Sequence, residues 1–165
     1  MKRLFVLVAA LLLSTMAMAQ KSDVHLSLSA DFKSSTTFNH DSFIADDLSL
    51  VWGCHFNDKW ALTIPFTATT VKDVTYKTYS DNLFLGLGGE YKFHKGNVAD
   101  WSVVTRVQST IGKNEWGGAM TYDFGIMDEC ENVTTTIGVK YFDARNPHLN
   151  DRFCFYLSFG FRLCM

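Results

Sequence analysis

The chain has 165 residues, of which 19% are charged and 15% aromatic, and its formal net charge is -2 at pH 7. This charge is too small to favour nucleic acid as a partner, and the charged fraction is below the roughly 25% of soluble globular domains. The length suits one domain and argues against two.

The first 19 residues have the layout of a cleavable secretory signal. Lys2 and Arg3 precede the apolar run Leu4–Leu13, and small residues lead to Ala17-Met18-Ala19. An apolar run this short is a poor membrane-spanning helix, so we expect cleavage after Ala19. Residues 20–165 then form the mature domain, in which no later apolar run is long enough for a membrane helix.

Eight segments of alternating apolar and polar residues follow, which is the pattern of β-strands with one apolar face. The first, third, fifth and seventh connections between them are longer than the others, so we expect one rim of long loops and one of short turns. Pro65 lies inside the third segment and lacks a ladder N–H, which predicts a bulge or an early end of pairing. The segments are Val24–Phe32, Asp47–Phe56, Trp60–Thr69, Leu83–Phe93, Trp101–Ile111, Met120–Ile126, Val133–Tyr141 and Phe153–Met165.

Nearly all charges inside these segments fall on the face opposite the bulky apolar side chains. If that face met lipid, each Arg or Lys at mid-depth would cost roughly 2–4 kcal/mol. The whole set would cost about 10 kcal/mol, which is comparable to the stability of a domain. We therefore expect the apolar face outside and the charges inside, with Arg106 nearly opposite Asp123, where the two can pair. The predicted lumen charges are Asp47, Glu90, Arg106, Asp123, Lys140 and Arg162.

The sequence thus predicts an all-β fold, an eight-stranded antiparallel up-and-down transmembrane β-barrel in contact with membrane lipids. Aromatic residues cluster where strands meet short turns, and such residues form girdles at membrane interfaces. We expect five of them to lie at the inner interface: Phe56, Trp60, Tyr91, Phe93 and Trp101.

The export signal, the eight segments and the polar inner face resemble the small OmpA/OmpX-type outer-membrane barrels over essentially the whole mature chain. Ser158, Gly160, Leu163 and Met165 have a spacing similar to the terminal signal that barrel-assembly machinery recognises. The resemblance implies residence in the bacterial outer membrane and assembly through the C-terminal strand. It implies no single activity, because members include adhesins, anchors, small channels and lipid-modifying enzymes.

We expect a structural or surface-interaction role without catalysis. Eight strands leave room for side chains and little else, so the polar lumen should be largely plugged by paired charges. The longer loops would face outward, where an extracellular ligand or surface partner could bind them. A narrow ion channel is an alternative.

Two further alternatives use the same sequence differently. A soluble lipocalin-like barrel would bind a hydrophobic ligand with the apolar face turned inward, but the low charge content and the Gly, Ser and Thr of the polar face disfavour it. In a lipid-modifying enzyme, His40-Asp41-Ser42 could supply a nucleophile and base. Asn146-Pro147 is similar to a stretch of lipid A deacylases, yet Lys140-Tyr141-Phe142 stands where their His-x-Ser pair is expected, which argues against that activity.

The four cysteines form no obvious framework. Cys130 in a short turn and Cys164 near the chain end can approach each other, so an oxidising compartment permits a disulfide between them. No Cys-x-x-Cys or other metal-ligand spacing occurs, and we predict neither a metal nor a cofactor.

Overall fold

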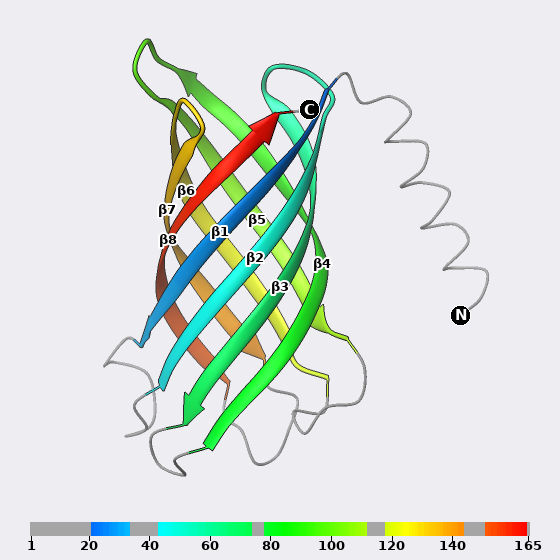
Figure 1. Cartoon of the computed structure of the whole chain (residues 1–165), viewed down its shortest axis with the longest axis vertical. Helices are drawn as coiled ribbons and strands as arrows, with labels where there is room; N and C mark the ends of the chain where they lie inside the picture. The colour runs from blue at the N-terminus through cyan, green and yellow to red at the C-terminus, as the bar shows by residue number, and fades with distance from the viewer. Residues whose placement is uncertain (1–20, 34–42, 74–77, 112–117, 144–150, 165) are drawn as a thin grey trace, which may run out of the picture.

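The computed structural model describes residues 21–33, 43–73, 78–111, 118–143 and 151–164. Within these ranges it contains eight strands, as the alternation of apolar and polar residues predicts. Each strand pairs antiparallel with the next along the chain, and the last pairs with the first (Figure 1), so the sheet closes into a barrel and the predicted fold class is confirmed. Over these ranges no helix has the length and apolar character needed to cross a membrane. The strands are β1 (Lys21–Lys33), β2 (Phe43–His55), β3 (Trp60–Asp73), β4 (Thr78–Lys95), β5 (Asp100–Thr110), β6 (Met120–Cys130), β7 (Val133–Asp143) and β8 (Arg152–Cys164).

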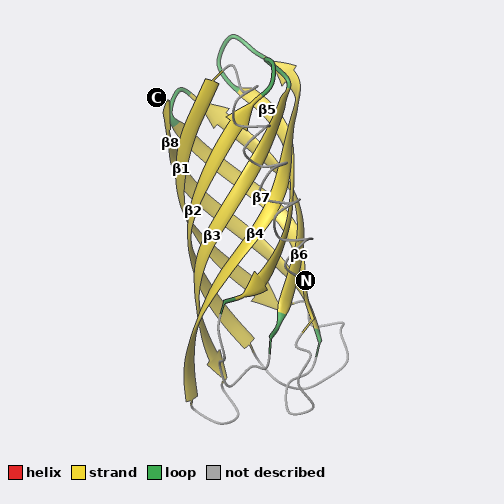
Figure 2. Ribbon diagram, turned by 90° about the vertical axis from the view of Figure 1, so that its right-hand side faces the viewer, coloured by secondary structure: helices red, strands yellow, loops and turns green. Residues whose placement is uncertain are grey.

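The strand register winds around the barrel. A row of paired residues that starts at Asp23 on β1 returns to β1 at Lys33, so the stagger, from residue 23 to residue 33, is ten residues. Such a stagger requires strands that are strongly inclined to the barrel axis (Figure 2) and an interior only wide enough for side chains. Between its ends the row passes Gly53, Thr63, Gly88, Arg106, Asp123, Lys140 and Cys154.

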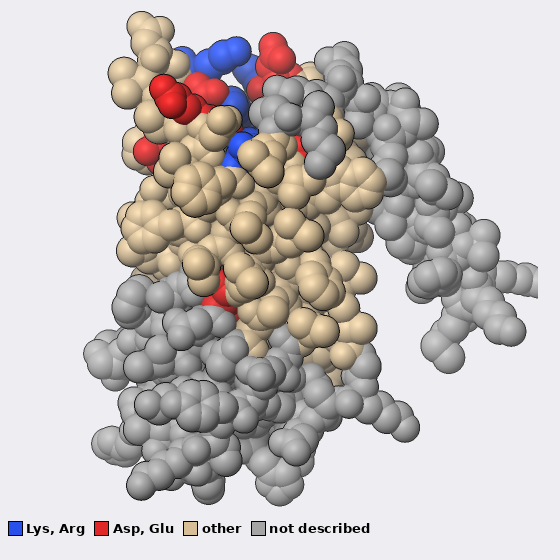
Figure 3. All heavy atoms as spheres, viewed as in Figure 1, with Lys and Arg blue, Asp and Glu red and all other residues tan. Residues whose placement is uncertain are grey.

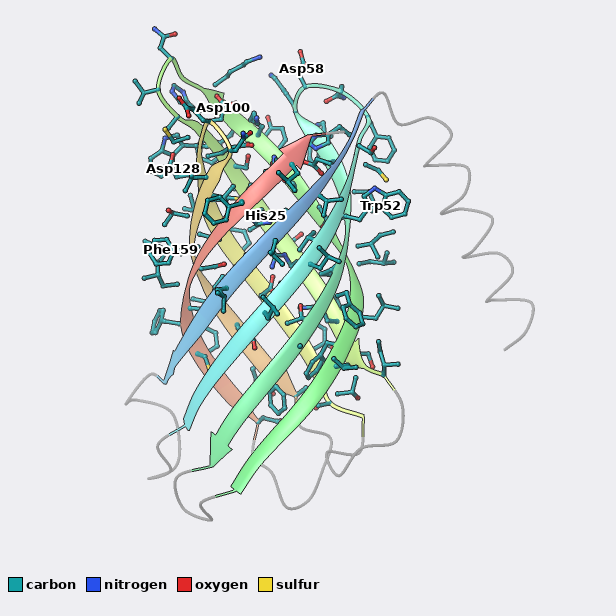
Figure 4. All side chains as sticks on the ribbon, viewed as in Figure 1. His25, Trp52, Asp58, Asp100, Asp128 and Phe159 are labelled. Atoms are coloured by element: carbon teal, nitrogen blue, oxygen red, sulfur yellow. The ribbon has the colours of Figure 1, made fainter. Side chains whose placement is uncertain are left out.

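The alternation sorts side chains onto an apolar outer face and a polar inner one. Leu28 and Ile137 point outward and are 63% and 65% exposed. Most charged side chains in view lie at one end of the barrel, above a broad band that has almost none (Figure 3). Trp52 and Phe159 point away from opposite sides of the barrel, whereas His25 lies between its walls (Figure 4). Exposed large apolar side chains occur on all eight strands, and an apolar band of this kind indicates contact with a membrane or another protein.

The turns 56–59, 96–99 and 131–132 and both described chain ends lie at one end of the barrel, the short-turn end (Figure 1). The expected alternation of long and short connections fails at the third, because β3 extends to Asp73 and β4 begins at Thr78. Residues 70–73 and 78–82 are mostly polar. The strand ends were predicted from the alternation of apolar and polar residues, and these two segments do not show it.

Pro65 interrupts one ladder without shifting it. The pairing of β3 with β4 skips Ile64 and Pro65 and then resumes in the same register. On the other side, Pro65 still stands opposite Val51 of β2. The missing N–H therefore leaves a local gap in the hydrogen-bond ladder between β3 and β4, and it causes no bulge. A register shift does occur between Lys92 and His94 of β4, opposite the start of β5.

Candidate functional site in the lumen

All six predicted lumen charges lie inside the barrel and are buried. Four of them form ion pairs that cross the lumen. Lys140 on β7 contacts Asp47 on β2 through its ammonium group. Arg162 on β8 holds Glu90 on β4, with 2.8 Å between Nη2 and Oε2. Because β8 and β4 stand on opposite sides of an eight-membered ring, the second pair crosses the interior.

Arg106 and Asp123 are direct register partners on β5 and β6. They nevertheless form no direct ion pair in the part of the chain that the structure describes. Arg106 instead lines a cavity together with Glu90 and Arg162, and every strand except β7 contributes a residue to its lining. The cavity offers about 10 Å³ to the centre of a water molecule. That volume holds about one water.

Arg162 is also the centre of a larger group that the sequence pattern did not identify. Its Nε lies 3.2 Å from Asp23 Oδ2, and its Nη1 lies 3.0 Å from Glu129 Oε2. With Glu90, three carboxylates therefore surround one guanidinium. We call the following residues the Arg162 cluster: Asp23, His55, Glu90, Lys92, Asp100, Glu129 and Arg162.

The other residues of the Arg162 cluster lie in the half of the lumen nearer the short turns. Lys92 Nζ donates a hydrogen bond to Asp100 Oδ2 at 2.7 Å and lies 3.5 Å from Glu129. His55 Nε2 lies 3.0 Å from Asp23 Oδ2. Asp23 precedes the first apolar residue of its predicted strand, and Glu129 stands beside a turn. Both were therefore missed, although each continues the inward alternation of its strand.

Glycines on neighbouring strands make room for the large lumen side chains. A Cβ at Gly88 would overlap the carbonyl oxygen of Thr105 and meet Arg106 Cγ at 3.0 Å. The inward glycines therefore stand where a bulky polar partner crosses their backbone. Three further examples are Gly53 beneath Asp23, Gly86 beneath Gln108 and Gly138 beneath Tyr156.

Toward the end of the barrel opposite the short turns, aromatic side chains enter the lumen. Phe84 on β4 and Phe142 on β7 are buried, and their ring centroids lie 6.5 Å apart in an edge-to-face arrangement. Lys140 Nζ lies 5.5 Å from the ring centroid of Tyr156. The sequence pattern predicted six charged residues in the lumen and none of these aromatic ones. Phe84, Phe142 and Tyr156 were not predicted as lumen residues, because aromatic residues were assigned only to the apolar face.

The predicted aromatic girdle lies at the short-turn end. The rings of Trp60 and Tyr91 are 4.4 Å apart between centroids. Trp60, Phe93 and Trp101 are exposed, while Phe56 and Tyr91 are half-buried. Trp60 and Trp101 lie at the starts of β3 and β5, Tyr91 and Phe93 lie near the end of β4, and Phe56 directly follows β2.

Cys130 is a free cysteine with an exposed side chain, so the disulfide that the sequence permits is not formed. Cys130 pairs in register with Val133 of β7, and β7 stands between it and the strand that carries Cys164. Two strand spacings, about 9.6 Å, exceed the Cα separation that a disulfide spans.

The other sequence-based candidates have no described geometry. The signal segment 1–19, His40-Asp41-Ser42 and Asn146-Pro147 lie outside the described residues. Among the residues that are described, no group of three or more His, Cys, Asp or Glu side chains could hold a metal ion.

Comparison with solved structures identifies the architecture. The N-terminal β-barrel domain of Pseudomonas aeruginosa OprF is 12% identical and superposes with a TM-score of 0.51 over 88% of this chain and 98% of that one. The chain has the fold of small eight-stranded outer-membrane barrels. A de novo designed transmembrane barrel (10% identity, TM-score 0.49, 90% and 100% coverage) and Yersinia pestis Ail in a nanodisc (11%, 0.49, 87% and 99%) also match. No protein-family profile matches the sequence, and no curated protein does.

Proposed function

We propose that the protein is an integral protein of the bacterial outer membrane, exported with cleavage after Ala19 and inserted by barrel-assembly machinery through β8. The observation that carries this proposal is the distribution of side chains, apolar outside and paired charges inside. A lipocalin-like barrel needs the reverse arrangement, because its ligand lies against an apolar interior. The outer-membrane barrel fold supports the same proposal.

We further propose that the barrel serves as an anchor for its outward connections, which would meet a surface ligand or partner, and that its lumen is largely plugged. Three features support a plug: the Lys140–Asp47 contact, the Arg162 cluster and the pair Phe84–Phe142. Buried charges are stable only when paired, so these cross-links are costly to open. The proposal assigns no catalytic role.

Membrane residence is tested by washing. After alkaline carbonate extraction of cells that express the full chain, we expect the protein in the membrane pellet, because the apolar belt holds it in the hydrocarbon. Recovery in the supernatant would support a soluble ligand-binding barrel instead.

Heating should change the gel mobility of the folded protein. A closed ladder resists detergent until it is boiled, so unboiled and boiled samples in dodecyl sulfate should migrate differently. Identical mobility of the two samples would contradict a closed barrel.

Conductance distinguishes an anchor from a channel. We expect the refolded mature chain to leave the baseline current of a planar bilayer unchanged, because the cavity beside Arg106 admits about one water and no hydrated ion. Repeated unitary steps that scale with salt concentration would show that it is a narrow ion channel. A mock-refolded sample without protein is the control.

A further inference from the structure

An acidic residue stands on the outer face of the barrel near the short-turn end. Asp128 of β6 follows the exposed Ile126 on the same face, whereas the next residue, Glu129, points into the lumen toward Lys92 and Arg162. Figure 4 shows Asp128 close to this end of the barrel. The residue therefore marks the boundary where the apolar belt meets the polar rim.

Asp128 differs from the lumen carboxylates at this end because no described residue provides a cation beside it. Asp23, Asp100 and Glu129 each lie within 3.2 Å of an Arg or Lys nitrogen. Asp128 forms no hydrogen bond or ion pair with any described residue, and its Oδ1 is buried without a partner. A carboxylate at the edge of a low-dielectric layer is stabilised by a nearby cation. No described residue supplies this cation, so the position is open to a cation of the surrounding lipid.

Two hydrogen-bond donors flank Asp128 on the same outer face. Trp101 of β5 and Thr135 of β7 are its register partners. No hydrogen bond links either side chain to another described residue. Neighbouring strands lie about 4.8 Å apart, so the three side chains form a row roughly 10 Å long. An acceptor for a cation thus lies between an indole N–H and a hydroxyl, both of which can donate to an anion.

We propose that Trp101, Asp128 and Thr135 bind the headgroup of a zwitterionic phospholipid that carries a primary ammonium, namely phosphatidylethanolamine. The ammonium donates to Asp128 Oδ2, the carboxylate oxygen that is not buried, and to the Thr135 hydroxyl oxygen, while the lipid phosphate accepts from Trp101 Nε1–H. A choline headgroup has no N–H and cannot make the first contact, and a glycerol headgroup has no cation. This inference rests on the proposed membrane residence.

The test is lipid retention by the refolded mature protein, measured by native mass spectrometry. Micelles contain equal amounts of phosphatidylethanolamine, phosphatidylcholine and phosphatidylglycerol. We expect wild type to retain phosphatidylethanolamine about two- to fivefold more than phosphatidylcholine, the range of an exposed charged contact. Asp128→Asn should abolish this preference. Asp58→Asn is the matched control, because it removes an exposed carboxylate from the turn 56–59, at the same end but away from the row.

Equal retention of the ethanolamine and choline lipids by wild type would overturn the proposal, and so would loss of the preference in Asp58→Asn. If Asp128→Asn does not fold, Trp101→Phe keeps an aromatic ring and removes the N–H. It should lower the retention of both lipids, and unchanged retention would count against the site. Folding is checked by the heat-dependent mobility shift, so failure of the lipid site is distinguishable from failure of the barrel.

Discussion

Replacing Arg162 with Met is expected to destabilise the folded barrel by about 3–5 kcal/mol, the cost of removing one partner from a buried ion pair. The substitution leaves Glu90, Glu129 and Asp23 around a site that no longer holds their shared cation. The measurement is urea-dependent unfolding in phospholipid vesicles, with the folded fraction read from the mobility shift.

A second substitution shows whether the loss is electrostatic. Glu90→Gln in the Arg162→Met background removes one of the uncompensated carboxylates, so the double variant should be more stable than Arg162→Met alone. If the two destabilisations simply add, the loss comes from packing of the long side chain, and the ionic account of the Arg162 cluster is wrong.

Gly88→Ala should destabilise the barrel by about 1–3 kcal/mol, the usual cost of overpacking a filled interior. The new Cβ would overlap a backbone carbonyl, that of Thr105, which cannot rotate away, and would press on the stem of Arg106. The same unfolding measurement in vesicles gives the change.

The neighbouring residue provides the control. A Cβ at Gly89 would meet Thr105 Oγ1 at 3.7 Å, an ordinary van der Waals distance, so Gly89→Ala should change stability by less than about 0.5 kcal/mol. Because the two residues are adjacent on β4, they share strand propensity and differ in the face on which the side chain would stand. Equal losses at both positions would show that close packing inside the lumen is not the cause.

The sequence sufficed for the architecture because the two faces of each strand meet different surroundings. A residue such as Phe159 can be stable outside and Arg162 inside only if the strand keeps its period of two. Where both faces of a strand are polar, the alternation no longer shows where the strand ends. The outer part of β3, up to Asp73, and the start of β4 at Thr78 carry polar residues that suit both faces, and their pairing was missed.

The lumen contacts were less predictable than the lumen residues. Sequence neighbours along the sheet suggested that Arg106 would pair with Asp123, and the register does place them opposite each other. The structure instead pairs Arg162 with Glu90, although their strands, β8 and β4, are not neighbours in the barrel. Long side chains reach across a narrow interior, so three-dimensional distance decides the partner. Phe84 and Phe142 were missed because an aromatic on the polar face has no distinct sequence pattern.

The central claim is that the apolar face meets lipid and the polar face lines a lumen. Nuclear Overhauser contacts between acyl-chain protons and methyl groups, recorded on the protein in lipid nanodiscs, test it most directly. Leu28 and Ile137 should show strong acyl contacts, whereas Val51 and Val104, buried in the lumen, should show none. Acyl contacts at Val51 and Val104, with none at Leu28 and Ile137, would contradict the assignment of the two faces.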